Sequence, residues 1–168
     1  MGEGNPEMGW RPLPKGHTVT NGGNFTAGCP MTLGVLAVVQ DGEGRVLLVK
    51  TSYRGLRWQL PGGYVEQGES PLEALSREAQ EELGTDIHDP QLVCVYCKTY
   101  ESNMNLIFRG ALGSGHPVAD GKEVLECRYY RIDDLPAEVS PRVRAIILAA
   151  VQGPVPFLKV FKNPLEST

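Results

Sequence analysis

The sequence predicts one α/β domain. Its length of 168 residues, with 41% hydrophobic and 21% charged residues, is typical of a single soluble globular domain. Short apolar runs typical of strands are interspersed with two patterns typical of amphipathic helices. Seven of the 20 glycines and four of the 13 prolines fall within the first 30 residues, a composition that buries little apolar surface. We therefore expect a flexible tail over residues 1–30, the domain over 31–153 and a C-terminal extension over 154–168.

The domain begins with strands. Residues 33–40 and 45–51 are apolar runs, and the turn at 41–44 between them contains the Asp-Gly pair typical of a hairpin. A short third strand is expected at 58–60. It ends at Pro61-Gly62-Gly63, where two adjacent glycines permit backbone conformations that other residues avoid.

The clearest helix is expected over residues 70–83. Ser70 is a favoured N-cap residue, Pro71 suits the first helical position, and Glu73 completes a capping box. Gly84 fits the C-terminal cap. Spacings of 3, 4 and 4 give the expected core-facing stripe, which consists of Leu72, Leu75, Ala79 and Leu83.

Further strands and a second helix complete the domain. The helix is expected over 141–151, with strands over 91–100, 105–112 and 123–132 before it. Its apolar face carries Val143, Ile146, Ile147 and Ala150.

Charge and hydropathy exclude several classes of partner. The formal net charge is −4 and the pI is about 5.4; without a basic run, these values argue against broad binding to duplex nucleic acid. The apolar stretch at 31–39 is far shorter than the ~20 residues that a membrane-spanning helix needs, and no secretory signal precedes it. We therefore expect a cytoplasmic protein with no membrane partner. The oligomeric state is left open, a homodimer included.

The cysteines do not form a zinc motif. Cys94 and Cys97 have CxxC spacing, but they fall in an expected strand, where positions i and i+3 point to opposite faces. No second CxxC or histidine pair supplies further ligands. We expect buried free thiols.

The negative charge is concentrated in one segment. Residues 63–84 contain six glutamates and one basic residue, Arg77, which gives a formal charge of −5. On a helix, Glu78, Glu81 and Glu82 share one face, and Arg77 is spaced to pair with Glu81. Like charges this close repel unless solvent, protonation or a cation intervenes, and Mg²⁺ or Mn²⁺ prefers oxygen ligands of this kind. Two hypotheses stay open: a solvated acidic surface and a metal site.

Residues 63–85 resemble the motif of a known family. They read GYVEQGESPLEALSREAQEELGT, which is similar to the Nudix box, Gx5Ex7REUxEExGU, where U is a bulky aliphatic residue. Ala79 and Thr85 depart from the pattern at the two U positions. The seven fixed positions all match: Gly63, Glu69, Arg77, Glu78, Glu81, Glu82 and Gly84. The resemblance extends over residues 32–153.

The resemblance implies the Nudix α/β/α sandwich, with a mixed β-sheet between helices. It also implies a hydrolase, dependent on Mg²⁺ or Mn²⁺, that cleaves a nucleoside diphosphate linked to another moiety, X, by attack of water on phosphorus. Such a substrate is polyanionic, so cations must separate it from the acidic segment. The implied metal ligands are the carbonyl oxygen of Gly63 and the carboxylates of Glu78, Glu81 and Glu82, with Arg77 and Glu69 orienting them.

The resemblance also implies candidates for catalysis. The general base would come from the box or a later strand, with Glu82, Glu123 and Glu126 as candidates in that order. The expected catalytic set is Glu82, Glu81, Arg77 and Glu123.

Substrate-binding residues are expected near the loop before Pro61. The candidates for stacking a base or binding a phosphate are Tyr53, Arg54, Arg57 and Trp58, and Trp58 fits the core at least equally well. Tyr100 lies sixteen residues after Gly84, where dinucleoside polyphosphate hydrolases often carry tyrosine. The proline that marks ADP-ribose hydrolases is absent there, and the tryptophan- and proline-rich signature of NADH hydrolases is absent as well.

Two other functions stay open. A nucleotide-binding or regulatory module could keep the fold without turnover, although such a protein has no need for three mutually repelling carboxylates. An enzyme acting on the 5′ triphosphate of RNA would need a basic groove, which the near-neutral remainder of the chain does not favour.

Overall fold

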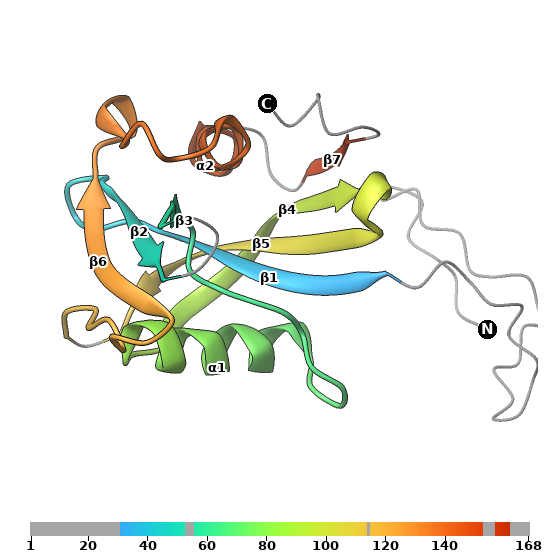
Figure 1. The fold of residues 1–168 in the computed structure, drawn as a ribbon, viewed down its shortest axis with the longest axis horizontal. Coiled ribbons are helices and arrows are strands. Elements are labelled where there is room, and N and C mark those ends of the chain that lie inside the picture. Colours follow the sequence, from blue (N-terminus) through green and yellow to red (C-terminus); the bar gives the residue numbers. More distant parts are fainter. Residues whose placement is uncertain (1–30, 53–55, 114, 153–156, 162–168) are drawn as a thin grey trace, which may run out of the picture.

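The computed structural model describes residues 31–52, 56–113, 115–152 and 157–161, the last range by its backbone alone. The expected tail therefore lies outside the described residues, as do Tyr53 and Arg54. Helix α1 (Pro71–Leu83) lies on one side of the strands and α2 (Pro141–Gln152) on the other (Figure 1). The predicted α/β/α arrangement is confirmed.

The described strands form two sheets. The first sheet is mixed and has the order β1-β5-β4-β7, whereas the second is antiparallel and has the order β3-β2-β6. The mixed sheet that the resemblance implies is therefore accompanied by a second one. The strands are β1 (Thr32–Val39), β2 (Val46–Thr51), β3 (Trp58–Gln59), β4 (Ile87–Lys98), β5 (Asn103–Leu112), β6 (Val124–Tyr130) and β7 (Phe157–Phe161), with short 3-10 helices η2 (Thr99–Glu101) and η3 (Ile132–Asp134).

The hairpin expected between the first two strands is wrong. The turn itself forms, because Asp41 Oδ1 accepts hydrogen bonds from the backbone N–H groups of Glu43 and Arg45 at 3.0 and 2.9 Å. Beyond one isolated bridge between Gln40 and Val46, however, the strands separate: β1 pairs with β5, and β2 pairs with β3 and β6. A local turn motif reverses the chain but does not choose the partners of the strands that follow it.

Both faces of the central strands are buried. Successive side chains on a strand point to opposite faces, so Leu47 and Val49 pack in the core on the α1 side, while Val46 and Leu48 pack on the α2 side. This explains why the sequence shows continuous apolar runs instead of alternation. Helix α2 contributes the four residues predicted for its apolar face, Val143, Ile146, Ile147 and Ala150, all of which are buried.

Helix α1 has the predicted ends. Glu73 N–H donates to Ser70 Oγ at 3.3 Å and Ser70 N–H donates to Glu73 Oε2 at 2.7 Å, which is the capping box, and the cap residue Gly84 has a φ of 66°. The predicted stripe needs one correction. Leu72 is 52% exposed and Ala74 is buried, because the packed face of the first turn is centred between Ala74 and Leu75.

Strand β7 was not predicted. It pairs in parallel with the end of β4, from Cys94 to Lys98, and so extends the four-stranded sheet with residues of the C-terminal extension. Within the part of the chain that the structure describes, no helix is long and apolar enough to cross a membrane.

Candidate active site

The segment after β3 is held against β1 by backbone hydrogen bonds. Ala37 N–H donates to the carbonyl oxygen of Pro61, and Val35 N–H donates to that of Gly63, each at 2.9 Å. The turn therefore has a fixed position beside the four-stranded sheet.

The two glycines of this turn allow a close approach. A Cβ at Gly62 would lie 2.2 Å from the carbonyl oxygen of Val35, and Gly62 also has a φ of 127°. A Cβ at Gly63 would lie 2.2 Å from Glu78 Oε1. Glu78 can keep this position only if residue 63 is glycine. The position of the Glu78 carboxylate on α1 therefore depends on the Gly-Gly turn.

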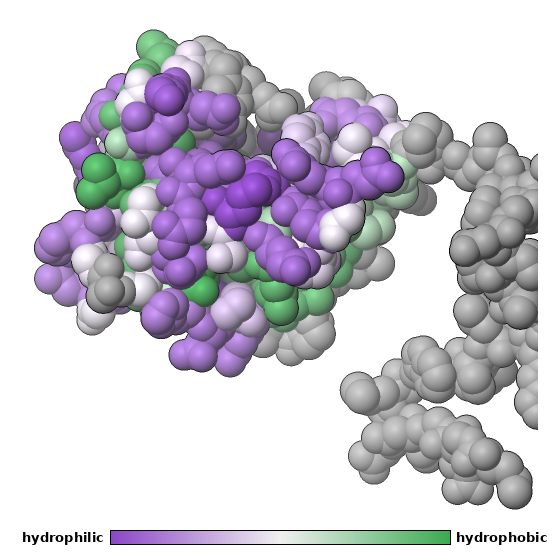
Figure 2. Space-filling model, turned by 90° about the horizontal axis from the view of Figure 1, so that it is seen from below, coloured by the Kyte–Doolittle hydropathy of each residue, from purple (hydrophilic) through white to green (hydrophobic). Residues whose placement is uncertain are grey.

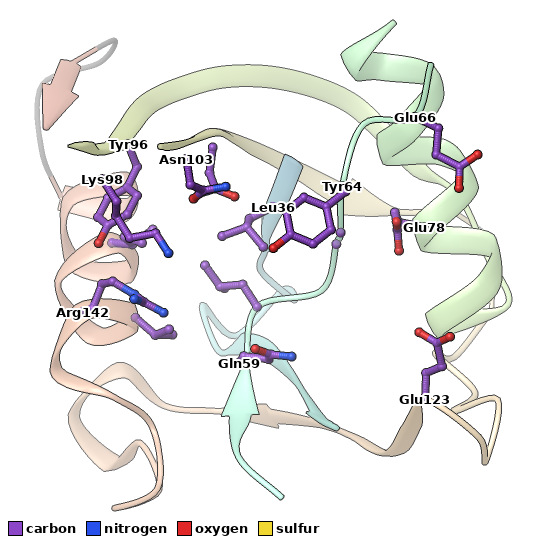
Figure 3. Close-up of a pocket in the computed structure, with 16 residues that line it drawn as sticks. Leu36, Gln59, Tyr64, Glu66, Glu78, Tyr96, Lys98, Asn103, Glu123 and Arg142 are labelled. Carbon is purple, nitrogen blue, oxygen red and sulfur yellow. The ribbon is translucent and has the colours of Figure 1, made fainter. Parts of the chain in front are cut away.

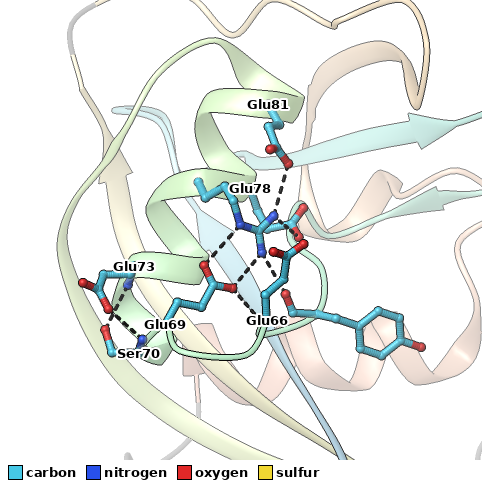
Figure 4. A network of polar contacts seen from close by, with 8 residues as sticks. Glu66, Glu69, Ser70, Glu73, Glu78 and Glu81 are labelled. Carbon is cyan, nitrogen blue, oxygen red and sulfur yellow. Dashed lines mark hydrogen bonds and ion pairs between the residues drawn. The ribbon is translucent and has the colours of Figure 1, made fainter.

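Arg77 gathers the carboxylates of α1 and of the preceding turn (Figure 4). Its Nε and Nη2 donate to the two carboxylate oxygens of Glu69 at 3.2 and 2.8 Å, while Nη1 donates to Glu78 Oε1 at 2.9 Å and Glu81 Oε2 at 3.2 Å. Nη2 also donates to the carbonyl oxygen of Tyr64 at 2.9 Å. These bonds raise the pKa of Arg77 and lower that of Glu69. Arg77 therefore positions both Glu78 and Glu81.

Glu82 is buried, with 4% of its surface exposed. Its Oε2 accepts a hydrogen bond from Gly62 N–H at 2.7 Å. Burial raises the pKa of Glu82 to about 8, and the negative charges of Glu78, Glu123 and Asp120 act in the same direction against that hydrogen bond. A buried carboxylate beside other carboxylates is therefore stable at neutral pH only when a proton or a cation offsets its charge.

The three implied carboxylate ligands differ in their surroundings. Glu78 lies on the inner side of α1, where burial raises its pKa and Arg77 opposes that rise. Glu81 is on the outer side, with 61% of its side chain exposed. Among the described residues, no three Asp, Glu, His or Cys side chains are grouped closely enough to hold a metal ion. Glu78 and Glu82, with the Gly63 carbonyl, offer the hard oxygen donors that Mg²⁺ and Mn²⁺ prefer, so the donor chemistry fits the implied metal. The ligand set stays a prediction.

Glu123 lies near these glutamates, in the turn immediately before β6. Asp120 fixes the turn before it by accepting hydrogen bonds from the N–H groups of Glu123 and Val124 at 3.1 and 2.8 Å. The charge of Glu123 raises the pKa of both Glu78 and Glu82. By contrast, Glu126 forms ion pairs with Lys50 and Arg128 at 3.0 and 3.2 Å. Sequence reasoning missed Asp120, whose role depends on the turn and not on the motif.

A cavity of about 380 Å³ adjoins this acidic cluster (Figure 3). Glu66, Glu78 and Glu123 line its side nearest α1, whereas Lys98 and Arg142 line the opposite side. Glu81, Glu82 and Glu126 do not line it. The acidic and basic ends belong to one continuous cavity, so a single ligand of sufficient length could contact both.

Of the substrate-binding residues expected before Pro61, the two that the structure describes, Arg57 and Trp58, do not line this cavity. Arg57 is exposed, and Trp58 is only 6% exposed and belongs to the core on the α2 side. The Trp58 ring packs edge-on against Tyr130 with the ring centroids 5.1 Å apart, and Lys50 Nζ lies 5.7 Å from the Trp58 centroid. The expectation that Trp58 stacks a base is corrected, because its faces are already covered by protein.

Other aromatic and polar residues line the cavity. Tyr64 stands in the middle of the cavity view and is 54% exposed. Gln59, Asn103 and Asn105 add amide groups to the lining. Tyr100 lies in η2, half-buried against the α2-side core. Sequence reasoning missed the lining residues because Tyr64 is at a variable position of the motif; the one available signal was a polar residue, Asn103, at the start of an apolar strand.

Two of the three described cysteines, Cys94 and Cys97, are buried as expected, whereas Cys127 is only half-buried, and none of the three is in a disulfide. Cys29 lies outside the described residues. Burial raises the pKa of the Cys127 thiol to about 11, which favours the protonated thiol at neutral pH.

The fold and the site together define a class of protein: an α/β/α sandwich in which a capped glutamate-rich helix packs against a Gly-Gly turn. The family model described as "NUDIX domain" matches residues 30–150. The chain therefore belongs to the NUDIX domain family.

Named relatives and structures agree with this assignment. The NAD-capped RNA hydrolase NudC of Stutzerimonas stutzeri is 37% identical over 75 residues, which is 45% of this chain and 27% of that protein. NudC of Escherichia coli O1:K1 is 29% identical over 102 residues, or 61% of this chain and 40% of that protein. The crystal structure of a MutT NUDIX hydrolase from Burkholderia pseudomallei has a TM-score of 0.65 and 28% identity, covering 73% of this chain and 99% of that one. The match spans less than half the length of the two NudC proteins.

Proposed function

We propose that this protein is a divalent-metal-dependent pyrophosphohydrolase that cleaves a nucleoside diphosphate linked to another moiety, X. The observation that carries the proposal is the contact between Glu78 and Gly63 at the acidic end of the cavity, which no residue with a Cβ would allow. Family membership supports it, since the relatives that this chain matches are named as hydrolases.

The residues have distinct roles in this proposal. The carboxylates of Glu78, Glu81 and Glu82 and the carbonyl oxygen of Gly63 would hold Mg²⁺ or Mn²⁺. The bound ion would neutralise diphosphate charge and lower the pKa of water. Arg77 acts as a positioning residue, because it joins Glu78 and Glu81 to one guanidinium nitrogen. The rigid turn at residues 61–63 fixes the carbonyl donor relative to α1.

Glu82 and Glu123 are the candidates for the general base. A general base must lie within hydrogen-bond reach of the proton that it removes. Glu82 is buried beside Gly62 and does not line the cavity, whereas Glu123 lines it from the turn before β6. Glu126 is the weaker candidate, because its carboxylate forms ion pairs with Lys50 and Arg128.

The names of the relatives do not decide the substrate class of this chain. The NudC proteins are named for NAD-capped RNA, but this chain matches at most 40% of their length. Both tryptophans of this chain, Trp10 and Trp58, precede the motif, so a tryptophan-containing signature after it is absent. We propose a small-molecule nucleotide substrate in the cytoplasm, with X and the base to be identified by experiment.

A substrate screen tests this proposal. Purified protein is incubated with NDP-sugars, dinucleoside polyphosphates, NADH and dNTPs, first with Mg²⁺ and then with Mn²⁺. Release of a nucleoside phosphate from at least one class, abolished by EDTA, is the expected result. Nucleotide binding without turnover of any class would favour a regulatory module.

A further inference from the structure

The two ends of the cavity carry opposite charge (Figure 3). Glu66, Glu78 and Glu123 line one end, and Lys98 and Arg142 point into the other. A diphosphate held through cations at the acidic end accounts for only one end of this arrangement. The positive charge at the basic end is not explained by binding of the diphosphate.

Arg142 differs from the other arginine of the same helix turn. Arg144 donates to the carbonyl oxygens of Val139 at 3.3 Å and Leu135 at 2.9 Å, and also to that of Pro136; it therefore ties α2 to the segment before it. Arg142 is half-buried, yet in the part of the chain that the structure describes it has neither an ion pair nor a hydrogen-bonded acceptor. Packing on α2 does not require its charge.

The position of Arg142 on α2 makes its charge costly. It is the second residue of a 12-residue helix whose first turn has no acidic residue. Because the helix macrodipole is positive at this end, a cation there is disfavoured unless an anion is present. The helix N-terminus and the guanidinium therefore create a positive field in the same place, and an anion would relieve both.

Lys98 reinforces the field from β4. Its side chain is only 12% exposed, and it pairs with the carboxylate of Glu101, which is 48% exposed. Part of the Lys98 charge is therefore already balanced, whereas that of Arg142 is not. The neighbouring Gln59 and Asn103 provide polar groups along the same wall.

We propose that Arg142, assisted by Lys98, binds a second anionic group of the substrate, separate from the diphosphate. This inference rests on the proposed function for the placement of the diphosphate at the acidic end. The anionic group is a carboxylate or a phosphate, since a guanidinium binds both through charge-assisted, often bidentate hydrogen bonds. The enzyme would then select nucleotides that carry an extra negative charge on X or on the nucleoside.

Matched ligand pairs test this subsite. Affinities of the full chain are measured by titration calorimetry, with Ca²⁺ in place of Mg²⁺, for UDP-glucose against UDP-glucuronic acid and for NADH against NADPH. The wild type should bind the more negative member of at least one pair about tenfold more tightly, as expected for one charged hydrogen-bonded contact. A preference in the sugar pair identifies a carboxylate on X, and a preference in the dinucleotide pair identifies a phosphate on the nucleoside.

Variants of the two arginines provide the control. Arg142→Gln should remove the preference without lowering the melting temperature, and Arg142→Lys should keep part of it. Arg144→Gln should lower the melting temperature and keep the preference. Equal affinities within both pairs, no detectable binding of the charged members, or a preference that survives in Arg142→Gln would overturn the proposal. Turnover of the same ligands with Mg²⁺ is scored separately: turnover without charge preference contradicts the subsite alone, and charge preference without any turnover contradicts the proposed function alone.

Discussion

Helices α1 and α2 lie on opposite sides of the sheets and contribute to opposite ends of one cavity, but they hold their charged side chains differently (Figure 1). On α1, the charge of Arg77 is shared among Glu69, Glu78 and Glu81. On α2, Arg142 has no such partner among the described residues. The α1 end is thus arranged before any ligand arrives, whereas the α2 end is arranged to receive one.

The outer surface of α1 separates exposed glutamates from a buried one. Figure 2 views the molecule from the side of α1, where hydrophilic residues cover the middle of the face. Glu81 is on this outer side, while Glu82 is one residue further along and buried. A helix that was only a solvated acidic surface would not bury a glutamate against a glycine N–H.

Removal of metal should have the largest effect on the α1 end. In excess EDTA we expect turnover to fall by several orders of magnitude, because the acidic cluster would repel a polyanionic substrate. With metal, the rate should rise into the alkaline range, since the attacking water must lose a proton and the three histidines, at positions 17, 88 and 116, lie outside the motif. Rates are measured with EDTA and after addition of Mg²⁺. Full turnover in EDTA would show that the carboxylates serve another purpose.

The features of α1 that could be predicted are local ones. The capping box, Gly84 and the pairing of Arg77 with Glu81 involve residues no more than four positions apart, so the helical period determines them. The contacts of Arg77 with Glu69 and of Glu82 with Gly62 depend on how the turn folds back; the family resemblance indicated that these residues matter, but not their geometry.

The features that could not be predicted depend on distant parts of the chain. The Asp-Gly turn gave no information that β1 would pair with β5 and β2 with β6. Hydrophobic periodicity placed α2 correctly but is silent on Arg142, because an arginine on a helix is ordinarily solvated. Its significance appears only when Lys98 and the far wall of the cavity are brought beside it.

Gly63→Ala should displace the Glu78 carboxylate with little effect on the stability of the fold. The added Cβ would meet the end of the flexible Glu78 side chain, which can turn away at little cost in stability but then leaves its place beside the carbonyl of residue 63. We expect kcat to fall roughly 10- to 100-fold, as for a small misplacement of a catalytic group, with a change of only a few degrees in melting temperature. Gly42→Ala is the matched control, since a Cβ there meets nothing within 4 Å. Equal rates for both variants would show that the position of Glu78 is unimportant.

The pH dependence of stability should report the burial of Glu82. Its pKa in the folded protein, about 8, is above the ordinary value of 4.5, so the folded state binds the proton more tightly than the unfolded state does. The metal-free protein should therefore lose stability as the pH rises from about 4.5 to about 8, by ~1.4 kcal/mol for each unit of the shift. Urea unfolding in EDTA across this range measures the slope.

Two variants test whether Glu82 causes the dependence of the unfolding free energy on pH. Glu82→Gln should flatten it, because the neutral amide does not titrate, and Glu73→Gln should leave it unchanged. The same slope in Glu82→Gln as in the wild type would mean that Glu82 is not the group responsible.

The most direct test of the catalytic metal site compares kcat of Glu82→Gln and Glu73→Gln at saturating Mg²⁺, together with their melting temperatures in EDTA. Glu73→Gln alters only the capping box and should cost at most a few tenths of a kcal/mol of stability, with a rate within a few-fold of wild type. Glu82→Gln should lower kcat by orders of magnitude, each factor of ten corresponding to about 1.4 kcal/mol of barrier, while the metal-free protein keeps or gains stability because one member of a repelling cluster is gone. Small and equal effects on kcat at both positions would contradict the account.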